Sequence, residues 1–240
     1  LERRLKALRV RWAHDRAVDI ETADGAVCAV RGEGESYAAD AVILATGGVS
    51  YPATGSTGDG HRLAAALGHT VTELDGSLVP LEGVIAPGIP CARLQGLSLR
   101  NVGLTVYEGK RKIYQDFGEL LFAHFGVSGP LVLSASAHMR HFEKKDYRFE
   151  IDLKPALDQN QLDKRLLADF QKYLNHDFRN ALDDLLPQKL IPVVVELSGI
   201  PPQEKVHDIT REQRQALLAV LKAFPVAITQ KRPVTDAIVT

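Results

Sequence analysis

Short alternations of apolar and polar residues run through the first forty positions of the chain. This period of two is typical of half-buried strands, and a turn-forming pair, Asp24-Gly25, separates two of the runs. The pattern predicts a small β-meander, preceded by a helix in which Leu1, Leu5 and Leu8 share one face. The expected strands cover residues 9–14, 17–22, 26–31 and 35–39.

A run of five apolar residues, Ala41 to Ala45, does not alternate, which predicts a central strand covered on both faces. The chain then becomes rich in glycine and small hydroxyl side chains up to Gly60, and residues 60–67 have the apolar spacing of a helix. A buried strand, a glycine-rich turn and a helix, in this order, let α/β proteins bring a phosphate or nucleotide close to bare backbone. A tight turn that only caps the helix is the alternative that this local pattern leaves open.

The remainder of the chain changes from strand-like to helical patterns. In the middle third, strand-like runs surround one helical segment, which indicates a small antiparallel barrel or sandwich. Apolar residues then recur at helical spacing between 158 and 221, and Thr210 with Gln213 predicts a capping box at the start of the last helix. The expected strands are 69–74, 97–107, 111–116, 147–153, 226–230 and 235–240, and the helix in the middle third is 131–141.

The composition is that of an ordinary globular protein, with 45% apolar and 25% charged residues. The net charge of −1 provides no global attraction to nucleic acid or to an anionic membrane. Two cysteines are too few for a disulfide scaffold and fit a reducing, cytoplasmic location. No apolar run reaches the roughly 18 to 20 residues of a membrane span, so no membrane partner is expected. Both ends look cut, and we expect an excised piece of a longer protein.

Few side chains outside the glycine-rich stretch suggest chemistry. His124 lies between aromatic residues and could act as a general acid, but no partner is visible, so a satisfied, partly buried histidine is expected. Arg100 could hold a substrate carboxylate, although solvated surface arginines are common, and Tyr51 is the third catalytic candidate. The histidine pairs lack nearby acidic or cysteine residues that would complete a ligand set, so no metal site is expected.

Several longer motifs carry a resemblance to a known family. They are Val42-Ile-Leu-Ala-Thr-Gly-Gly-x-Ser-Tyr-Pro-x-Thr-Gly-Ser-Thr-Gly-Asp-Gly60, Leu78–Leu81, Gly96–Asn101, Gly118–Pro130 and Asp236–Thr240. With these motifs the chain resembles, over nearly its whole length, the BaiN/YhiN-type bacterial FAD-dependent oxidoreductases. These are flavoproteins of the glutathione-reductase-like two-dinucleotide superfamily. The amino-terminal GxGxxG segment and the carboxy-terminal FAD-binding segment of that family are absent here, so we expect most FAD contacts to be missing and FAD to bind weakly or not at all.

The resemblance implies an α/β fold plus an inserted α+β domain. The expected fold has three parts: a partial Rossmann-like FAD-binding portion, a small antiparallel β-barrel and a helical subdomain. The boundaries expected on this basis are 1–76 for the partial FAD-binding domain, 77–155 for the barrel-like part of the insert, 156–224 for its helical part, and 225–240 for strands that return to the FAD domain.

The resemblance also implies FAD as the cofactor, NAD(P)H as the electron donor and a small organic molecule as the substrate, with bile-acid-like enones as one class. The remainder of the FAD domain would be a further partner. The residues expected beside the FAD, or at the mouth of the insert, are Ala45, Thr46, Gly47, Gly48, Ser50, Thr54, Gly55, Ser56, Thr57, Gly58, Asp59 and Gly60.

Two other functions compete with part of an FAD-dependent oxidoreductase. The first is a non-enzymatic ligand- or RNA-binding module, against which the near-neutral charge and the lack of an aromatic–basic surface motif argue. Nucleic acid is therefore an unexpected partner. The second is a nucleotide-binding protein that uses the loop from Gly55 to Gly60.

Overall fold

The computed structural model describes residues 2–240, which fall into two compact units that separate between Leu74 and Asp75. The first unit begins with helix α1 (Glu2–Ala7), as the leucine spacing predicts, although Leu1 lies outside the described residues. Three antiparallel strands follow in the order β1-β2-β3, which confirms the predicted meander. Their bounds are Ala17–Ala23 for β1, Ala26–Gly32 for β2 and Ser36–Ala38 for β3.

The turn between β1 and β2 has the geometry that its sequence favours. Asp24 and Gly25 both have positive φ, 50° and 79°, as a two-residue hairpin turn that matches strand twist requires. By contrast, the strand expected at residues 9–14 is not formed. Residues 10–16 have no ladder partner, and the side chain of Trp12 is exposed, so alternation alone did not suffice to make a strand there.

The central strand expected at residues 41–45 is also wrong for this structure. Residues 41–48 adopt no regular secondary structure, and the side chain of Ile43 is 92% exposed. A central strand needs a hydrogen-bonded neighbour on each side, whereas β1, β2 and β3 pair only with one another among residues 2–240. The strand expected at 69–74 is absent for the same reason, with Val71 and Leu74 exposed.

Helix α2 (Asp59–Ala66) follows the glycine-rich stretch, as predicted, after a single 3-10 turn, η1 (Pro52–Thr54). Leu67 ends α2, and Gly68 follows it with a φ of 87°, the left-handed conformation that commonly terminates a helix. Leu63 is the buried apolar side chain of this helix.

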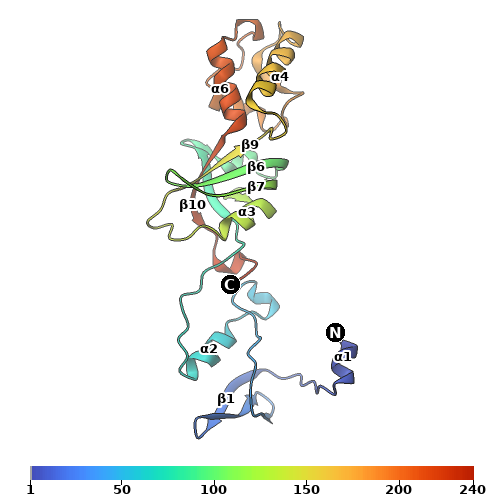
Figure 1. Ribbon diagram of the computed structural model, residues 1–240, viewed down its shortest axis with the longest axis vertical. Helices are drawn as coiled ribbons and strands as arrows, with labels where there is room; N and C mark the ends of the chain where they lie inside the picture. Colours follow the sequence, from blue (N-terminus) through green and yellow to red (C-terminus); the bar gives the residue numbers. More distant parts are fainter. Residues whose placement is uncertain (1) are drawn as a thin grey trace. The chain divides into compact units, whose positions relative to one another are not determined.

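The second unit is built on a closed antiparallel β-barrel, which confirms the predicted barrel. Six strands pair in the order β10-β9-β6-β7-β8-β4, and β4 pairs back to β10. Figure 1 shows β6, β7, β9 and β10 in this unit. The bounds are Leu81–Ala86 for β4, Ser98–Glu108 for β6, Arg111–Phe122 for β7, Gly126–Ser128 for β8, Tyr147–Asp152 for β9 and Phe224–Lys231 for β10. The short β5 (Ile89–Pro90) pairs with β4 and leads into η2 (Cys91–Leu94).

Glycines allow the barrel to close at both edges of β4. A Cβ added at Gly126 of β8 would lie 2.2 Å from the carbonyl oxygen of Leu81, and one at Gly83 would lie 2.3 Å from that of Ala227 on β10. Real side chains do not tolerate such distances, so the two seams need glycine at these points. The second glycine-rich motif of the sequence, residues 118–130, therefore contributes to barrel closure.

The prediction for the carboxy-terminal residues of the chain needs correction. Residues 225–240 were expected to return to another domain, but β10 completes the barrel. The strand expected at 235–240 is replaced by a 3-10 turn, η5 (Val234–Asp236), and a single bridge between Val239 and Ser77. Pro233 directly precedes η5, and proline lacks the N–H that a continuing ladder would require.

Helices complete the second unit. The capping box at Thr210 and Gln213 is present, and a second one at Asp158 and Gln161 starts α4. Helices α4 and α6 lie side by side (Figure 1), and their buried residues join those of the barrel in one continuous core. The bounds are Pro130–Ser136 for α3, which is shorter than predicted, Gln159–Lys172 for α4, Ile191–Ser198 for α5 and Arg211–Lys222 for α6, with 3-10 turns η3 (Phe178–Leu182) and η4 (Val206–Asp208).

Candidate functional site

The glycine-rich loop, residues 45–60, closes on itself through backbone contacts. The amide of Gly58 donates to the carbonyl of Gly48 at 3.2 Å. The backbone N–H and the hydroxyl of Thr54 both donate to the carbonyl of Tyr51, at 2.9 and 2.8 Å. These hydrogen bonds hold the loop in a defined conformation, although within residues 2–240 it forms no β-ladder with a neighbouring strand.

Three of the loop glycines differ in what surrounds them. A Cβ added at Gly60 would lie 2.2 Å from Oγ1 of Thr46, and one at Gly47 would lie 2.9 Å from Oγ of Ser56. Gly55, with a φ of 97°, has no atom within 4 Å of its Cβ position. A side chain at Gly60 or Gly47 would therefore have to displace a hydroxyl group of the loop, whereas Gly55 leaves open space in front of its backbone.

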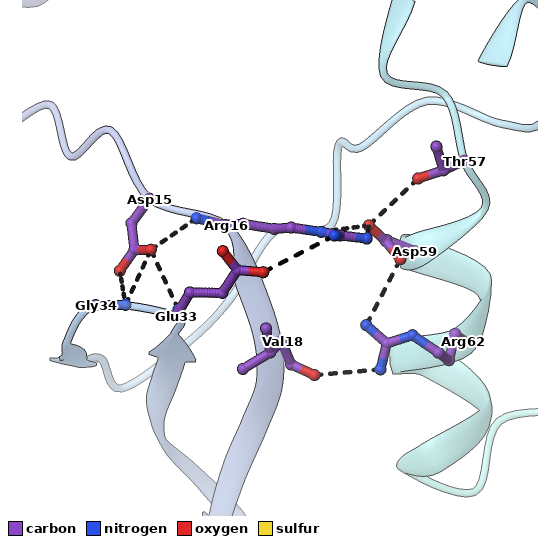
Figure 2. A network of polar contacts seen from close by, with 8 residues as sticks. All are labelled: Asp15, Arg16, Val18, Glu33, Gly34, Thr57, Asp59 and Arg62. Carbon is purple, nitrogen blue, oxygen red and sulfur yellow. Dashed lines mark hydrogen bonds and ion pairs between the residues drawn. The ribbon is translucent and has the colours of Figure 1, made fainter. Parts of the chain in front are cut away.

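Asp59 links the start of α2 to the meander (Figure 2). Its Oδ2 accepts from Nη2 and Nε of Arg16, at 3.1 and 3.3 Å, and from the hydroxyl of Thr57 at 3.3 Å. Its Oδ1 lies 3.6 Å from Arg62, which also donates to the carbonyl of Val18. The hydrogen bond from Arg16 is the main cause that lowers the pKa of the Asp59 carboxyl. The negative charge of Asp59 is thereby offset, which reduces its expected repulsion of a phosphate.

Arg16 is held in place by a second carboxylate. Asp15 accepts from the backbone N–H groups of Arg16, Glu33 and Gly34, at 2.8 to 3.2 Å, and so fixes the turn between β2 and β3 (Figure 2). The sequence analysis did not single out Asp15, Arg16 or Arg62. Arg16 and Asp59 lie 43 positions apart, and no local pattern pairs them.

His61 presents an unpartnered polar atom in the same region. Its Nδ1 is buried and has no hydrogen-bond partner within residues 2–240. The atom lies 3.8 Å from the Cβ position of Gly58, at the first turn of α2. Buried polar atoms are normally satisfied, so this nitrogen is available to a donor or acceptor outside the described chain.

FAD is the cofactor that the resemblance implies, and the loop fits it in part. Thr46, Gly47 and Thr57 are exposed, Gly55 has open space before it, and Nδ1 of His61 lacks a partner. Exposed backbone at a helix start suits a pyrophosphate or a ring edge. The described residues of this unit thus fit one edge of a dinucleotide and do not enclose it.

The catalytic candidates fall in both units, and the two in the second unit, His124 and Arg100, do not share a pocket. His124 lies in the turn between β7 and β8, where its ring meets that of Phe125 edge-on at 5.0 Å. It is exposed and makes no hydrogen bond within the described chain, so the expected partly buried, satisfied histidine is wrong. The turn is closed by the backbone of Ala123 and Gly126, which leaves His124 in solvent. Tyr51 belongs to the first unit and is 53% exposed.

Arg100, the remaining candidate, lies on β6 at an irregularity of the ladder with β7. It lines a pocket of about 590 Å³ together with Phe117 and Lys154, and His124 is not part of that pocket. A second pocket, of about 540 Å³, is lined by four cationic side chains near the turn between β6 and β7. Those cations are Arg111, Lys112, Arg140 and Lys145.

No helix within residues 2–240 has the length and apolar character needed to cross a bilayer.

Comparison with known proteins identifies relatives of this chain. Residues 75–239 match the family described as HI0933-like protein barrel and H2TH domain. The chain is 29% identical over 201 residues to the 3-dehydro-bile acid delta(4,6)-reductase of Clostridium scindens, which covers 80% of this chain and 48% of that protein.

Two further relatives are named for a different activity. The chain is 32% identical over 170 residues to the Ribosomal RNA dihydrouridine synthase of Haemophilus influenzae, with 71% of this chain and 39% of that protein covered. It is 28% identical over 190 residues to the Ribosomal RNA dihydrouridine synthase of Escherichia coli, with 78% and 44% covered. The chain thus spans half or less of the length of these relatives.

The family match begins where the second unit begins and includes the barrel and all the helices that pack on it. The chain therefore belongs to the HI0933-like family, which confirms the BaiN/YhiN-type flavoprotein resemblance carried by its motifs.

Proposed function

We propose that this chain is part of a flavin-dependent reductase that acts on a carbon–carbon double bond conjugated with a carbonyl group. The observation that carries the proposal is the chemistry shared by the names of the relatives. A delta(4,6)-reductase of a 3-dehydro-bile acid names double bonds that follow a ketone at C3. A dihydrouridine synthase names the product of saturating the C5–C6 bond of uridine, which is conjugated with the C4 carbonyl.

The residues of the glycine-rich loop suggest which part of the cofactor site this chain would supply. The FAD held there would, once reduced by the electron donor, provide the hydride for the end of the double bond remote from the carbonyl, and a proton from solvent would complete the saturation at the other end. The exposed backbone and hydroxyls of Thr46, Gly47 and Thr57, with the open side of Gly55, would contact one edge of the cofactor. Arg16 would keep Asp59 from repelling the cofactor phosphates, since it already binds that carboxylate. NAD(P)H is the proposed electron donor.

The test uses the full-length gene product, purified with FAD under nitrogen. We expect NADH or NADPH to bleach the flavin absorbance, and a 3-oxo-4-ene bile acid or a uridine-containing RNA to restore it. The saturated bile acid and a dihydrouridine-containing RNA are the matched controls and should not restore it. A reduced flavin that is reoxidised by oxygen but by neither unsaturated substrate would contradict the proposal.

An RNA substrate is the second candidate, and the cationic pocket near the β6–β7 turn favours it. Glu108 pairs with Lys145 at 2.9 Å and with Arg111 at 3.4 Å, so one carboxylate serves two cations. Arg140 and Lys112 line the same pocket without a carboxylate partner in the described chain, Lys112 donating to Gln115 instead. Clustered cations that exceed the local acids are the electrostatic feature that binds phosphodiester backbones.

This candidate can be tested by RNA binding alone. We expect a short single-stranded RNA to bind the chain with a salt-dependent affinity, measured by fluorescence anisotropy. Lys112→Gln and Arg140→Gln should each reduce the slope of log affinity against log salt by about one. Lys164→Gln, at an exposed position of α4, is the charge-matched control. Equal losses in all three variants would show non-specific attraction and would remove the support for an RNA substrate.

A further inference from the structure

Strand β6 carries an extra residue where it meets β7. Leu99 pairs with Leu120 and Val102 pairs with Gly118, so two residues of β6, Arg100 and Asn101, face one residue of β7. Asn101 has a φ of 58°, a left-handed conformation that asparagine adopts more readily than most residues other than glycine. Bulges of this kind redirect side chains and occur often beside binding sites.

The bulge forms one wall of the 590 Å³ pocket, which we call the bulge pocket. Phe117 of β7 provides a second wall, and the connection from β9 to α4, with Lys154, Pro155 and Leu157, provides the third. The ring of Phe117 is 58% exposed, unusually so for a large aromatic side chain. The volume lies within the range of about 300 to 1,000 Å³ that small-molecule sites have.

A glycine beside the pocket leaves a gap between two of the pocket's lining residues, Phe117 and Pro155. Gly103 of β6 pairs with Phe117 on one side and with Asp152 on the other, so all three positions point to the same face of the sheet. A Cβ at Gly103 would lie 3.4 Å from the Cβ of Asp152 and 3.9 Å from that of Pro155. A side chain would therefore fit there without a backbone clash and would project between Phe117 and Pro155.

The pocket holds two positive charges that the protein does not neutralise. Arg100 forms no hydrogen bond or ion pair with any residue from 2 to 240, and Glu119, which faces the bulge, is not its partner. The ammonium group of Lys154 likewise has no carboxylate partner in the described chain. Burial, followed by the nearby charge of Arg165, lowers the pKa of Lys154.

The nearest carboxylate is already occupied. Asp152 pairs with the ammonium group of Lys222 and accepts the backbone N–H of Lys154 at 2.9 Å. Lys222 also donates to the carbonyl of Leu157 at 2.8 Å, so it holds the third wall in position. A partly desolvated cation without a counter-charge is unfavourable, and an anionic ligand would remove that cost.

We propose that the bulge pocket binds an organic anion that has an apolar ring system and one carboxylate or phosphate. The anionic group would meet Arg100 and Lys154, and the rings would lie against Phe117 and Leu157. The names of two relatives, which mention a bile acid and the dihydrouridine of RNA, suggest one probe of each kind, a bile acid with its carboxylate and a uridine nucleotide with its phosphate. The inference concerns binding only, and it holds or fails without flavin and without the proposed redox reaction.

The first experiment measures binding of two anions and of their neutral analogues to the purified chain by isothermal titration calorimetry. Cholate and uridine 5′-monophosphate are the probes, and methyl cholate and uridine are the uncharged analogues. We expect at least one anion to bind, with an affinity at least about tenfold higher than that of its neutral analogue, as for a hydrogen bond between charged groups. Binding of cholate alone identifies a carboxylate ligand, and binding of the nucleotide alone identifies a phosphate ligand.

The second experiment locates the site. Arg100→Gln and Lys154→Met should each raise the Kd by about tenfold, since each removes one charged partner. Gly103→Val should weaken binding without changing charge, because its side chain would project between Phe117 and Pro155, which line the pocket. Lys110→Gln, at the exposed β6–β7 turn, removes one charge elsewhere and should leave the Kd unchanged. The proposal is overturned if neither anion binds, if the neutral analogues bind equally well, or if binding survives the Arg100 and Lys154 substitutions.

Discussion

Gly60 and Thr46 provide a direct test of whether the glycine-rich loop packs against α2 in solution. A Cβ added at Gly60 would lie 2.2 Å from Oγ1 of Thr46, but 3.5 Å from its Cβ and 3.8 Å from its Cγ2. Only the hydroxyl oxygen is therefore too close. Replacing Thr46 by alanine removes that oxygen and leaves an ordinary contact, so the effect of Gly60→Ala should depend on the residue at position 46.

Two opposing effects set the size of the change. In a helix without other contacts, Gly→Ala stabilises by up to about 1 kcal/mol, because alanine restricts the unfolded chain more than glycine does. Forcing an extra methyl group against a packed neighbour costs about 1 to 3 kcal/mol. We therefore expect Gly60→Ala to destabilise α2 by about 1 kcal/mol with Thr46 present, and to stabilise it by about 0.5 to 1 kcal/mol in a Thr46→Ala background.

Amide hydrogen exchange of α2 is the suitable assay, because the two units need not unfold together. The opening free energy of the Leu67 amide, which donates to Leu63 and Ala64, is compared in the four proteins of the double-mutant cycle. A coupling energy of about 2 kcal/mol is expected. If Gly60→Ala has the same effect in both backgrounds, the loop does not pack on α2, and the argument for the roles of its glycines fails.

Three further changes test other contacts. Gly126→Ala should destabilise the second unit by about 3 kcal/mol in urea unfolding followed by circular dichroism, since its Cβ would overlap a backbone oxygen, whereas Gly103→Ala should cost less than about 1 kcal/mol. The pKa of Asp59 is lowered by its hydrogen bond from Arg16, so this stabilisation is present above the ordinary value of 3.8 and is lost as the pH falls through the folded value. Exchange at α2 should show that loss, and Arg16→Gln should reduce the pH dependence, leaving the smaller part that is due to Thr57 and Arg62. Thr210→Ala should weaken α6 by about 1 kcal/mol and Thr210→Ser should restore it, again by exchange.

Features that depend on neighbours in the sequence were predicted well. The hairpin turn at Asp24-Gly25 and the capping box at Thr210 and Gln213 each involve residues at most three positions apart, and both are present. The barrel was also predicted, because its strands follow one another closely around recognisable turns and β9 alternates clearly. Its closure through β10 was not, since pairing of β10 with β4 joins residues about 140 positions apart, and no local pattern reports it.

The candidate sites illustrate the same limit. The pairing of Arg16 with Asp59, and the meeting of Arg100 with Lys154 in one pocket, depend on folding of distant segments. The prediction of a strand at 41–45 was wrong for a different reason. Its composition fits a buried strand, but burial depends on partners that the sequence of the run does not specify, and within residues 2–240 it has none.

The glycines of this chain show how a motif can combine two kinds of requirement. Gly126 and Gly60 are surrounded so closely that a Cβ would overlap a neighbouring atom, hence their presence is explained by packing alone. Gly55 has a left-handed φ and open space, so its backbone conformation needs glycine but its surroundings do not. These glycines belong to two family motifs, Gly55 and Gly60 to the first and Gly126 to the second, and neither motif by itself identifies a ligand site, because packing selects Gly60 and Gly126 whether or not a cofactor binds. The φ of Gly55 accounts for glycine at this position without a cofactor, so what bears on a cofactor contact is the open space in front of its backbone and not the glycine itself.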